Sequence, residues 1–122
     1  MGGLCHVPHG QAMMVLLPHC IDYNIAHGIN RGLYGELLLS VDETLYEATE
    51  PSRRDEVFAQ LIHTYNTRFN EQYGVPIALH EVGVGRDQLD AVAQQARYDG
   101  SALYNKVEIS VEMAKDILEA AY

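Results

Sequence analysis

Histidine is the residue of this 122-residue chain whose number and spacing best suit metal chemistry, with six copies. His9 lies between Pro8 and Gly10, just before an apolar run. On a straight helix, ten positions separate His9 and His19 by a net rotation of about 280°, so the two do not share a face. His6 and His9 could converge on a loop, but structural zinc normally takes four protein ligands, and neither HExxH nor CxxC occurs. Residue types and spacing alone therefore give a weak metal signal.

The two cysteines and the other histidines form no better catalytic group. Cys5 and Cys20 each neighbour a histidine in sequence, but adjacent side chains point apart on a helix, so no thiolate meets a base. We expect His27 and His63 to be surface or hydrogen-bonded interfacial residues, and His80 to be packed rather than catalytic. The chain has neither GxGxxG nor the phosphate-binding P-loop pattern, which predicts no dinucleotide-binding unit in it.

Charge and hydropathy narrow the classes of partner. Seventeen acidic and eight basic residues give a formal net charge of −9, which repels nucleic acid and anionic lipid surfaces. The longest apolar run, residues 12–17, is far shorter than the roughly 20 residues of a membrane helix. No basic residue precedes that run, so we expect no secretory signal. Two irregularly placed cysteines indicate reduced thiols, and we expect a cytoplasmic protein.

The elements that must position these residues are helices. Apolar residues return every three or four positions, and no long alternating stretch indicates a strand, so the predicted class is all-α. The length suits one domain with one core. We therefore predict a single helical domain over residues 1–122, a bundle of about five helices. The predicted helices cover residues 11–27, 34–47, 51–73, 89–96 and 111–121.

Particular residues set the expected faces and ends of these helices. The first helix is expected to bury one stripe at spacings of three and four, made of Met14, Leu17, Ile21 and Ile25. The second is expected to bury a stripe that includes Leu37 and Val41. Gly74 is expected to end the third helix, and Ser110 to cap the last one. Residues 74–85, rich in Gly and with one Pro, are predicted to be an irregular connection with at most one short helical turn.

The start of the chain carries the most specific pattern. Met1 and Gly2, the five residues GLCHV and then Pro8, His9 and Gly10 resemble the tail of the second signature of the iron-containing alcohol dehydrogenases. The stretch QAMMVLLPHCIDYN resembles the helix that follows that signature. The ending RYDGSALYNKVEIS…AKDILEAAY resembles the family's closing loop and helix. The resemblance covers the whole chain.

This resemblance implies a fold and a metal ligand. The family has an N-terminal α/β domain that binds the nicotinamide cofactor and a C-terminal all-helical domain of the dehydroquinate synthase-like type. Its divalent metal, iron or sometimes zinc, is held by an aspartate and three histidines, and His9 is implied to be the last of these histidines. The other ligands and a catalytic histidine would precede Met1, so the resemblance assigns no catalytic residue within the chain. The segment Asn105-Lys106-Val107 departs from the family's frequent Asn-Pro-Arg.

Two interpretations of His9 remain open at this point. If Gly10 and Gln11 begin a helix, His9 lies at its positive end, where the dipole favours a neutral ring with a nitrogen free for a metal. Alternatively, Pro8-His9-Gly10 is only a junction between loop and helix, with His9 hydrogen-bonded to a neighbouring backbone group. The sequence thus supports His9 as a ligand of the family metal but not as a complete site.

Three functional hypotheses follow. In the first, the chain is the C-terminal, metal-side domain of an NAD(P)-linked alcohol or aldehyde oxidoreductase, in which the metal polarises the substrate oxygen. The N-terminal nicotinamide-binding domain is then absent, the residues that contact cofactor are unknown, and the chain alone is expected to be inactive and to bind neither Fe²⁺ or Zn²⁺ nor NAD(P) stably. In the second, it is a non-enzymatic helical module. Either way, an exposed interdomain face predicts a homo-oligomer. The third, a new histidine metal site across a symmetric interface, is the weakest.

Overall fold

The computed structural model describes the backbone of residues 1–122 and the side chains of all of them except Ser101 and Leu103. Over these residues the chain is helical and contains no strand, which confirms the all-α class. Four 3₁₀-helices lie at Pro51–Arg53 (η1), Leu79–Val82 (η2), Arg86–Gln88 (η3) and Gly100–Tyr104 (η4). The α-helices are α1 (Gly2–Cys5), α2 (His9–Ala26), α3 (Leu33–Val41), α4 (Glu43–Ala48), α5 (Arg54–Tyr73), α6 (Leu89–Ala96) and α7 (Val111–Ala120).

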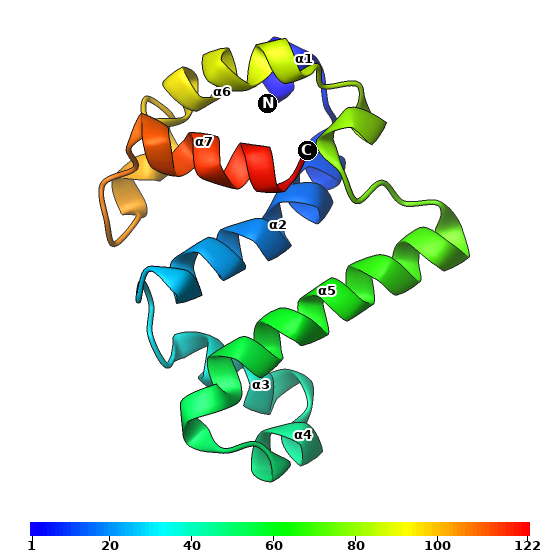
Figure 1. The fold of residues 1–122 in the computed structure, drawn as a ribbon, viewed down its shortest axis with the longest axis vertical. Helices are drawn as coiled ribbons and strands as arrows, with labels where there is room; N and C mark the ends of the chain where they lie inside the picture. The colour runs from blue at the N-terminus through cyan, green and yellow to red at the C-terminus, as the bar shows by residue number, and fades with distance from the viewer.

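The helices are arranged around α2 and α5, which contact each other through the middle of the molecule (Figure 1). In this view α6 and α7 lie on one side of that pair, and α3 and α4 lie on the other. Both chain termini lie in the part of the molecule that contains α6 and α7 (Figure 1). No helix among the described residues is both long and apolar enough to cross a membrane.

The prediction of one helix over residues 34–47 is wrong, because the chain breaks at Asp42. Asp42 leaves the helical region, with φ −152° and ψ 89°, so it ends α3 and becomes the N-cap of α4. Its Oδ1 accepts a hydrogen bond from the Leu45 N–H at 2.9 Å, which satisfies one of the unpaired donors at the start of α4. With this break and the short α1, the described part of the chain has seven α-helices rather than about five.

The helix ends predicted at Gly74 and Ser110 are confirmed. Gly74 follows α5 in the left-handed conformation, with φ 65°, and its N–H donates to the Asn70 carbonyl. The Ser110 hydroxyl accepts from the Met113 N–H at 3.0 Å and caps α7. The connection after Gly74 contains η2, in agreement with the single short turn expected there. Unexpectedly, Leu79 in η2 is 0% exposed, so this irregular segment is part of the core.

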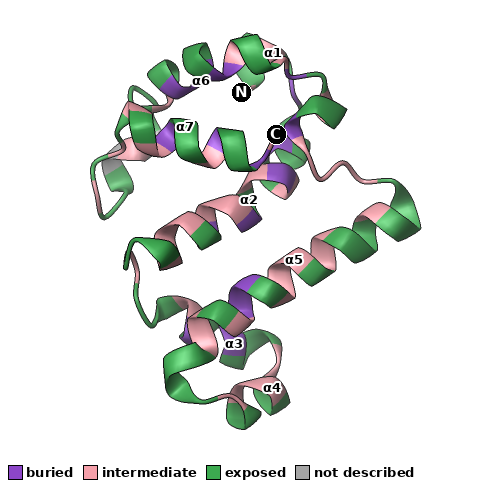
Figure 2. Ribbon diagram, viewed as in Figure 1, coloured by how far each residue is buried: buried purple, intermediate pink, exposed green. Residues whose placement is uncertain are grey.

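The expectation of one core is also wrong, because the buried apolar residues form two clusters (Figure 2). The α7 cluster joins α6, α7, η2 and the first half of α2 around residues such as Val15, Leu79 and Leu89. The α5 cluster consists of Ile21, Leu38, Phe58 and Ala59, from α2, α3 and α5. Among the described helices, α2 alone gives buried residues to both clusters. It is therefore the element that joins the two halves of the molecule.

The buried face of α2 agrees with the predicted stripe at Ile21 and differs from it at Leu17. The structure buries Ala12, Val15, Pro18 and Ile21, whereas Leu17 is 43% exposed and Met13 is 46% exposed. The sequence could not separate these faces because α2 is apolar on almost every side. The predicted stripe of the next helix is likewise exposed at Leu37 and Val41.

The first two residues of α5 hold α3 and α4 in place. The Asp55 carboxylate accepts from the backbone N–H groups of Gly32, at 2.7 Å, and Gly35, at 2.6 Å, and so caps the start of α3 from another helix. A Cβ atom on Gly35 would lie 2.8 Å from the Arg54 Cβ, so only glycine permits this close approach. The Arg54 Nε donates to the carbonyls of Tyr46 and Thr49 at the end of α4.

Candidate functional site

His9 is the first residue of α2, two positions before the start of the predicted helix at residue 11. Pro8 is the N-cap, with φ −56° and ψ 139°, and its carbonyl accepts from the Ala12 N–H at 3.0 Å. This arrangement follows from the sequence, because proline favours the extended backbone before a helix and has no N–H to leave unpaired. His9 is exposed and lies at the positive end of α2, as expected from the sequence.

The His9 ring makes none of the hydrogen bonds, ion pairs or ring contacts found among the described side chains. The second interpretation of His9, in which its ring hydrogen-bonds a neighbouring backbone group, is therefore not seen among the described residues. His6, the C-cap of α1 with φ 54°, is also exposed. Within the part of the chain that the structure describes, no group of three or more His, Cys, Asp and Glu side chains is placed to hold a metal ion. The described residues can therefore supply one ligand to a metal ion, His9, but not a complete set of metal ligands.

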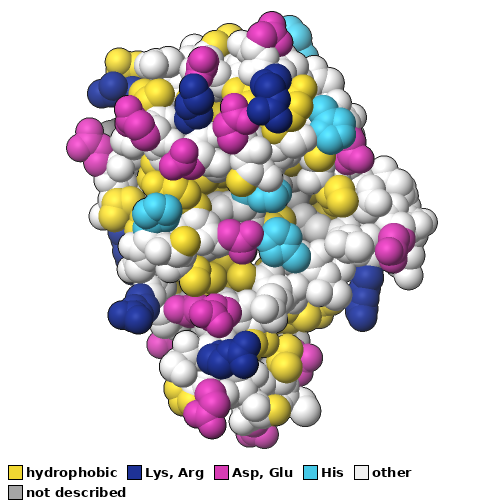
Figure 3. All heavy atoms as spheres, in the orientation of Figure 1, with side chains coloured by type: hydrophobic (Ala, Val, Ile, Leu, Met, Phe, Trp, Pro, Cys, Tyr) yellow, Lys and Arg dark blue, Asp and Glu magenta, His cyan; other side chains and the backbone are white. Residues whose placement is uncertain are grey.

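Three polar residues form a cluster between α2 and α5, away from the start of α2. The His63 Nε2 lies 2.6 Å from Asp22 Oδ2, and the His19 ring stands edge-on to His63 with centroids 5.8 Å apart. Burial lowers the pKa of His19, and the nearby His63 lowers it further, against the opposite effect of Asp22. His63 is therefore a hydrogen-bonded interfacial residue, as predicted. In the space-filling view of Figure 3, several histidine side chains lie near the middle of the visible face.

The other histidines are accounted for by local contacts. His27 stacks on Tyr23 with ring centroids 3.9 Å apart, and its Nδ1 lies 2.8 Å from the Tyr23 carbonyl oxygen. The His80 ring contacts the Tyr122 ring, and its Nδ1 lies 2.5 Å from the backbone oxygen of Tyr122. These contacts give both residues a structural role, in agreement with the prediction for His27.

The cysteines are not arranged for nucleophilic catalysis. Cys5 and Cys20 are free thiols, as expected. Burial raises the pKa of Cys20, so its thiol stays protonated at neutral pH and is a poor nucleophile. Neither residue forms a hydrogen bond to a histidine among the described side chains. The prediction that adjacency in sequence does not create a thiol and base pair is consistent with this geometry.

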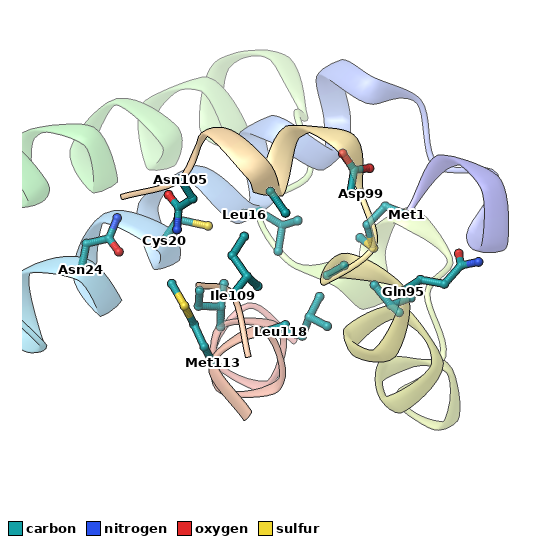
Figure 4. A pocket seen from close by; sticks show the side chains of 15 residues that line it. Met1, Leu16, Cys20, Asn24, Gln95, Asp99, Asn105, Ile109, Met113 and Leu118 are labelled. Atoms are coloured by element: carbon teal, nitrogen blue, oxygen red, sulfur yellow. The ribbon is translucent and has the colours of Figure 1, made fainter. Parts of the chain in front are cut away.

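Two features of α2 were not predicted from the sequence. Met13 and Leu17, four and eight positions after His9, form an exposed apolar stripe on the His9 side of the helix. Further along the same helix, Leu16, Cys20 and Asn24 form one wall of a cavity of about 390 Å³ (Figure 4). The sequence does contain a signal for both features, because α2 has more apolar residues than one buried face can hold. Some of these residues must therefore lie outside the two clusters.

Comparisons with known proteins match the whole chain. The model of the Fe-containing alcohol dehydrogenase family, C-terminal, matches residues 1–122. Alcohol dehydrogenase 4 of Saccharomyces cerevisiae is 29% identical over 122 residues, which are 100% of this chain and 29% of the relative. The 1,3-propanediol dehydrogenase of Citrobacter freundii is 28% identical over 122 residues, again 100% of this chain and 30% of the relative.

A third relative agrees with these two. Lactaldehyde reductase of Escherichia coli K12 is 27% identical over 124 residues, covering 100% of this chain and 30% of the relative. No solved structure matches the chain. The chain spans about three tenths of the length of the curated relatives that it matches.

Proposed function

Because the chain belongs to the iron-containing alcohol dehydrogenase family, whose C-terminal domain it matches along its whole length, we propose that it is the metal-side domain of an NAD(P)-linked alcohol dehydrogenase. The substrate class is a small alcohol or aldehyde. The support is the family match together with relatives named alcohol dehydrogenase 4, 1,3-propanediol dehydrogenase and lactaldehyde reductase. We place this function in the cytoplasm, in agreement with two unpaired cysteines.

His9 is the one ligand that this chain gives to the iron. The observation that carries this assignment is its exposed ring at the first residue of α2, with no partner among the described side chains. The ring is therefore accessible to a metal held from outside residues 1–122. Iron bound there would act as a Lewis acid that polarises the substrate oxygen.

The remaining ligands and the nicotinamide site must come from another domain, in the same polypeptide or in a partner. Within the described residues no three ligands converge, and the sequence holds no dinucleotide-binding pattern. A single imidazole does not hold iron stably. We therefore expect residues 1–122 alone, supplied with NAD⁺, Fe²⁺ and a short alcohol, to give no turnover. Substantial turnover from the pure chain would contradict this assignment.

Replacing His9 with alanine tests the metal role directly. Residues 1–122 would replace the matched C-terminal region of the Citrobacter 1,3-propanediol dehydrogenase, and iron content and 1,3-propanediol oxidation would be measured. Loss of a residue that only hydrogen-bonds to a metal ligand lowers metal affinity or activity about 10- to 100-fold. His9→Ala removes a ligand itself, so it should lower iron content and turnover more than about 100-fold. The chimera with His9 intact should bind iron and turn over.

The matched control is His6→Ala, three residues earlier and also exposed. This variant should keep the iron content and turnover of the parent chimera. Equal loss in both variants would show that the effect comes from the local backbone. Unchanged iron content in His9→Ala would remove His9 from the metal site.

We also propose that the isolated chain self-associates through the apolar stripe of Met13 and Leu17. Both side chains are more than two fifths exposed on the His9 side of α2, and neighbouring exposed apolar side chains favour a protein contact. The net charge of −9 opposes association of identical chains, so raising the salt concentration should strengthen it. Sedimentation velocity over a range of protein and salt concentrations measures this.

The double variant Met13→Glu with Leu17→Glu should remain monomeric where the parent associates. Leu37→Glu is the control, because Leu37 is equally exposed but lies on α3. A parent chain that stays monomeric at high concentration and high salt would contradict the self-association. Loss of association only in Leu37→Glu would move the interface to α3.

A further inference from the structure

A proline inside a helix leaves one carbonyl of that helix without its usual donor, and α2 contains such a proline at position 18. The N–H of residue 18 would donate to the Met14 carbonyl, four residues earlier, but Pro18 has no N–H. The Asn66 side chain of α5 fills this gap, because its Nδ2 donates to the Met14 carbonyl oxygen at 2.6 Å. We propose that Asn66 is a positioning residue, which completes α2 at this point and thereby fixes the half of the helix that carries His9.

The missing hydrogen bond lies where α2 passes from one cluster to the other. Val15 belongs to the α7 cluster and Ile21 to the α5 cluster, and Pro18 lies between them on the buried face. The helix nevertheless continues from His9 to Ala26 without a break. A helix bends most easily where a hydrogen bond between successive turns is missing. The direction of the first half of α2 therefore depends on what holds the Met14 carbonyl.

The chemistry of Asn66 suits this role. Its amide nitrogen carries two hydrogens and can donate to a carbonyl, whereas its amide oxygen cannot. Met14 and Asn66 are both half-buried, and water offsets only part of the free-energy cost of leaving such a carbonyl without a partner. Among the described side chains, two hydrogen bonds join α2 to α5, this one and the contact of His63 with Asp22. Asn66 thus anchors α2 to α5 close to its weakest point.

Asn66 acts on His9 through the helix. Met14 lies five residues after His9, or about 7.5 Å along the axis of α2, which is more than one turn. The other metal ligands must come from outside residues 1–122, so the His9 ring has to keep one position for them to meet it. This last step rests on the proposed function, whereas the role of Asn66 in completing α2 does not.

A double-mutant cycle between Asn66 and Pro18 tests the proposal on residues 1–122. Asn66→Ala removes the donor, and it should raise the equilibrium constant of unfolding about tenfold in a urea titration. Pro18→Ala supplies an N–H that can donate to the Met14 carbonyl within α2. In that background Asn66→Ala should therefore raise the constant less than about threefold.

The matched control is Asn70→Ala, one turn later on α5. Asn70 is also half-buried, and its Nδ2 donates to the Val75 carbonyl at 2.9 Å, a hydrogen bond that does not involve α2. Its effect on unfolding should be the same in the parent chain and in Pro18→Ala. Pro18→Val, which also has an N–H and keeps more of the buried volume, replaces Pro18→Ala if that variant does not fold. Asn66→Asp removes the donor and keeps the shape of the side chain.

The carbonyl carbon of Met14 reports the hydrogen bond directly. Its ¹³C chemical shift should change when Asn66→Ala is made in the parent chain, and should change little when the same substitution is made in Pro18→Ala. Asn70→Ala should leave this shift in place. A general loss of stability would not produce this pattern in the folded protein.

Iron affinity in the chimera with the Citrobacter enzyme tests the effect on His9, by competition with a chelator. Asn66→Ala should weaken iron binding about two- to tenfold, because the fraction of molecules with His9 in place falls by no more than the factor by which the lost hydrogen bond favoured it. Asn66→Ala should have no such effect when Pro18→Ala is also present. Asn70→Ala should keep the affinity of the parent chimera.

Four results would overturn the proposal or separate its parts. An equal effect of Asn66→Ala on unfolding in the parent chain and in Pro18→Ala would show that Asn66 does not replace the missing donor. The same dependence on Pro18 for Asn70→Ala would indicate a general weakening of α5. Unchanged iron affinity in Asn66→Ala, with loss in His9→Ala, would remove the positioning role. If His9→Ala also kept its iron, the metal role of His9 would fail and the positioning role with it, while the coupling of Asn66 to Pro18 in unfolding would stand.

Discussion

Replacing Asp55 with alanine should lower the free energy of unfolding by about 2–4 kcal/mol. The Asp55 carboxylate accepts from two backbone N–H groups, of Gly32 and Gly35, that no helical partner can satisfy. Hydrogen bonds to a charged group contribute about 1.5–3 kcal/mol each, and loss of an N-cap alone costs about 0.5–2 kcal/mol. Because Asp55 is half-buried, water recovers part of the loss. Urea unfolding followed by far-UV circular dichroism measures the change.

Two further variants separate the cap from a general effect of charge. Glu56→Ala removes the neighbouring carboxylate, whose exposed pair with Arg53 spans 3.8 Å, and should cost less than about 1 kcal/mol. Asp55→Asn keeps one acceptor oxygen but turns an N–H₂ group toward a backbone donor, so its cost should lie near that of Asp55→Ala. If Asp55→Ala and Glu56→Ala cost the same, the carboxylate does not hold α3.

Replacing Leu79 with alanine should have an equally large effect at the other end of the molecule. Leu79 is 0% exposed in the α7 cluster, and its N–H donates to the Ala121 carbonyl at 2.8 Å. Alanine keeps this hydrogen bond but leaves a cavity where the side chain was. Substitutions of this type cost about 2–5 kcal/mol, and the complete burial of Leu79 places it in the upper half of that range. The same urea titration gives the free energy of unfolding.

Leu37→Ala is the matched control, because Leu37 is 49% exposed on α3. This substitution should lower the free energy of unfolding by less than about 1 kcal/mol. Leu79→Met, which roughly conserves volume, should cost less than about 1.5 kcal/mol. A cost for Leu79→Ala near that of Leu37→Ala would mean that η2 is not part of the core.

Local signals in the sequence predicted most helices and their ends. Gly74 and Ser110 act through their own backbone or the next turn, so one segment contains all the information that places them. The break at Asp42 was missed because the apolar period continues across it. The buried face of α2 was missed for a different reason. Its apolar residues surround the helix, and only the arrangement of the other helices decides that Val15 is buried and Leu17 is not.

The candidate site divides in the same way. The position of His9 at the start of α2 follows from three consecutive residues, Pro8, His9 and Gly10, and the helix start was predicted to within two positions. The cavity beside Cys20 requires side chains from α2, α6 and α7, which lie up to about a hundred residues apart in sequence. No local pattern encodes that meeting. The cap on α3 is similar, since Asp55 reaches Gly32 across 23 positions.

The two clusters joined by α2 bear on how the chain unfolds. A helix shared by two separate sets of buried side chains allows one set to open while the other persists, because few contacts couple them directly. Amide hydrogens of α3 and the start of α5 would then exchange with solvent through a partial opening, and those of Val15 and Leu118 only through complete unfolding. The two clusters are in this sense separate units of local opening with one helix in common, within a chain that urea or heat unfolds as a whole.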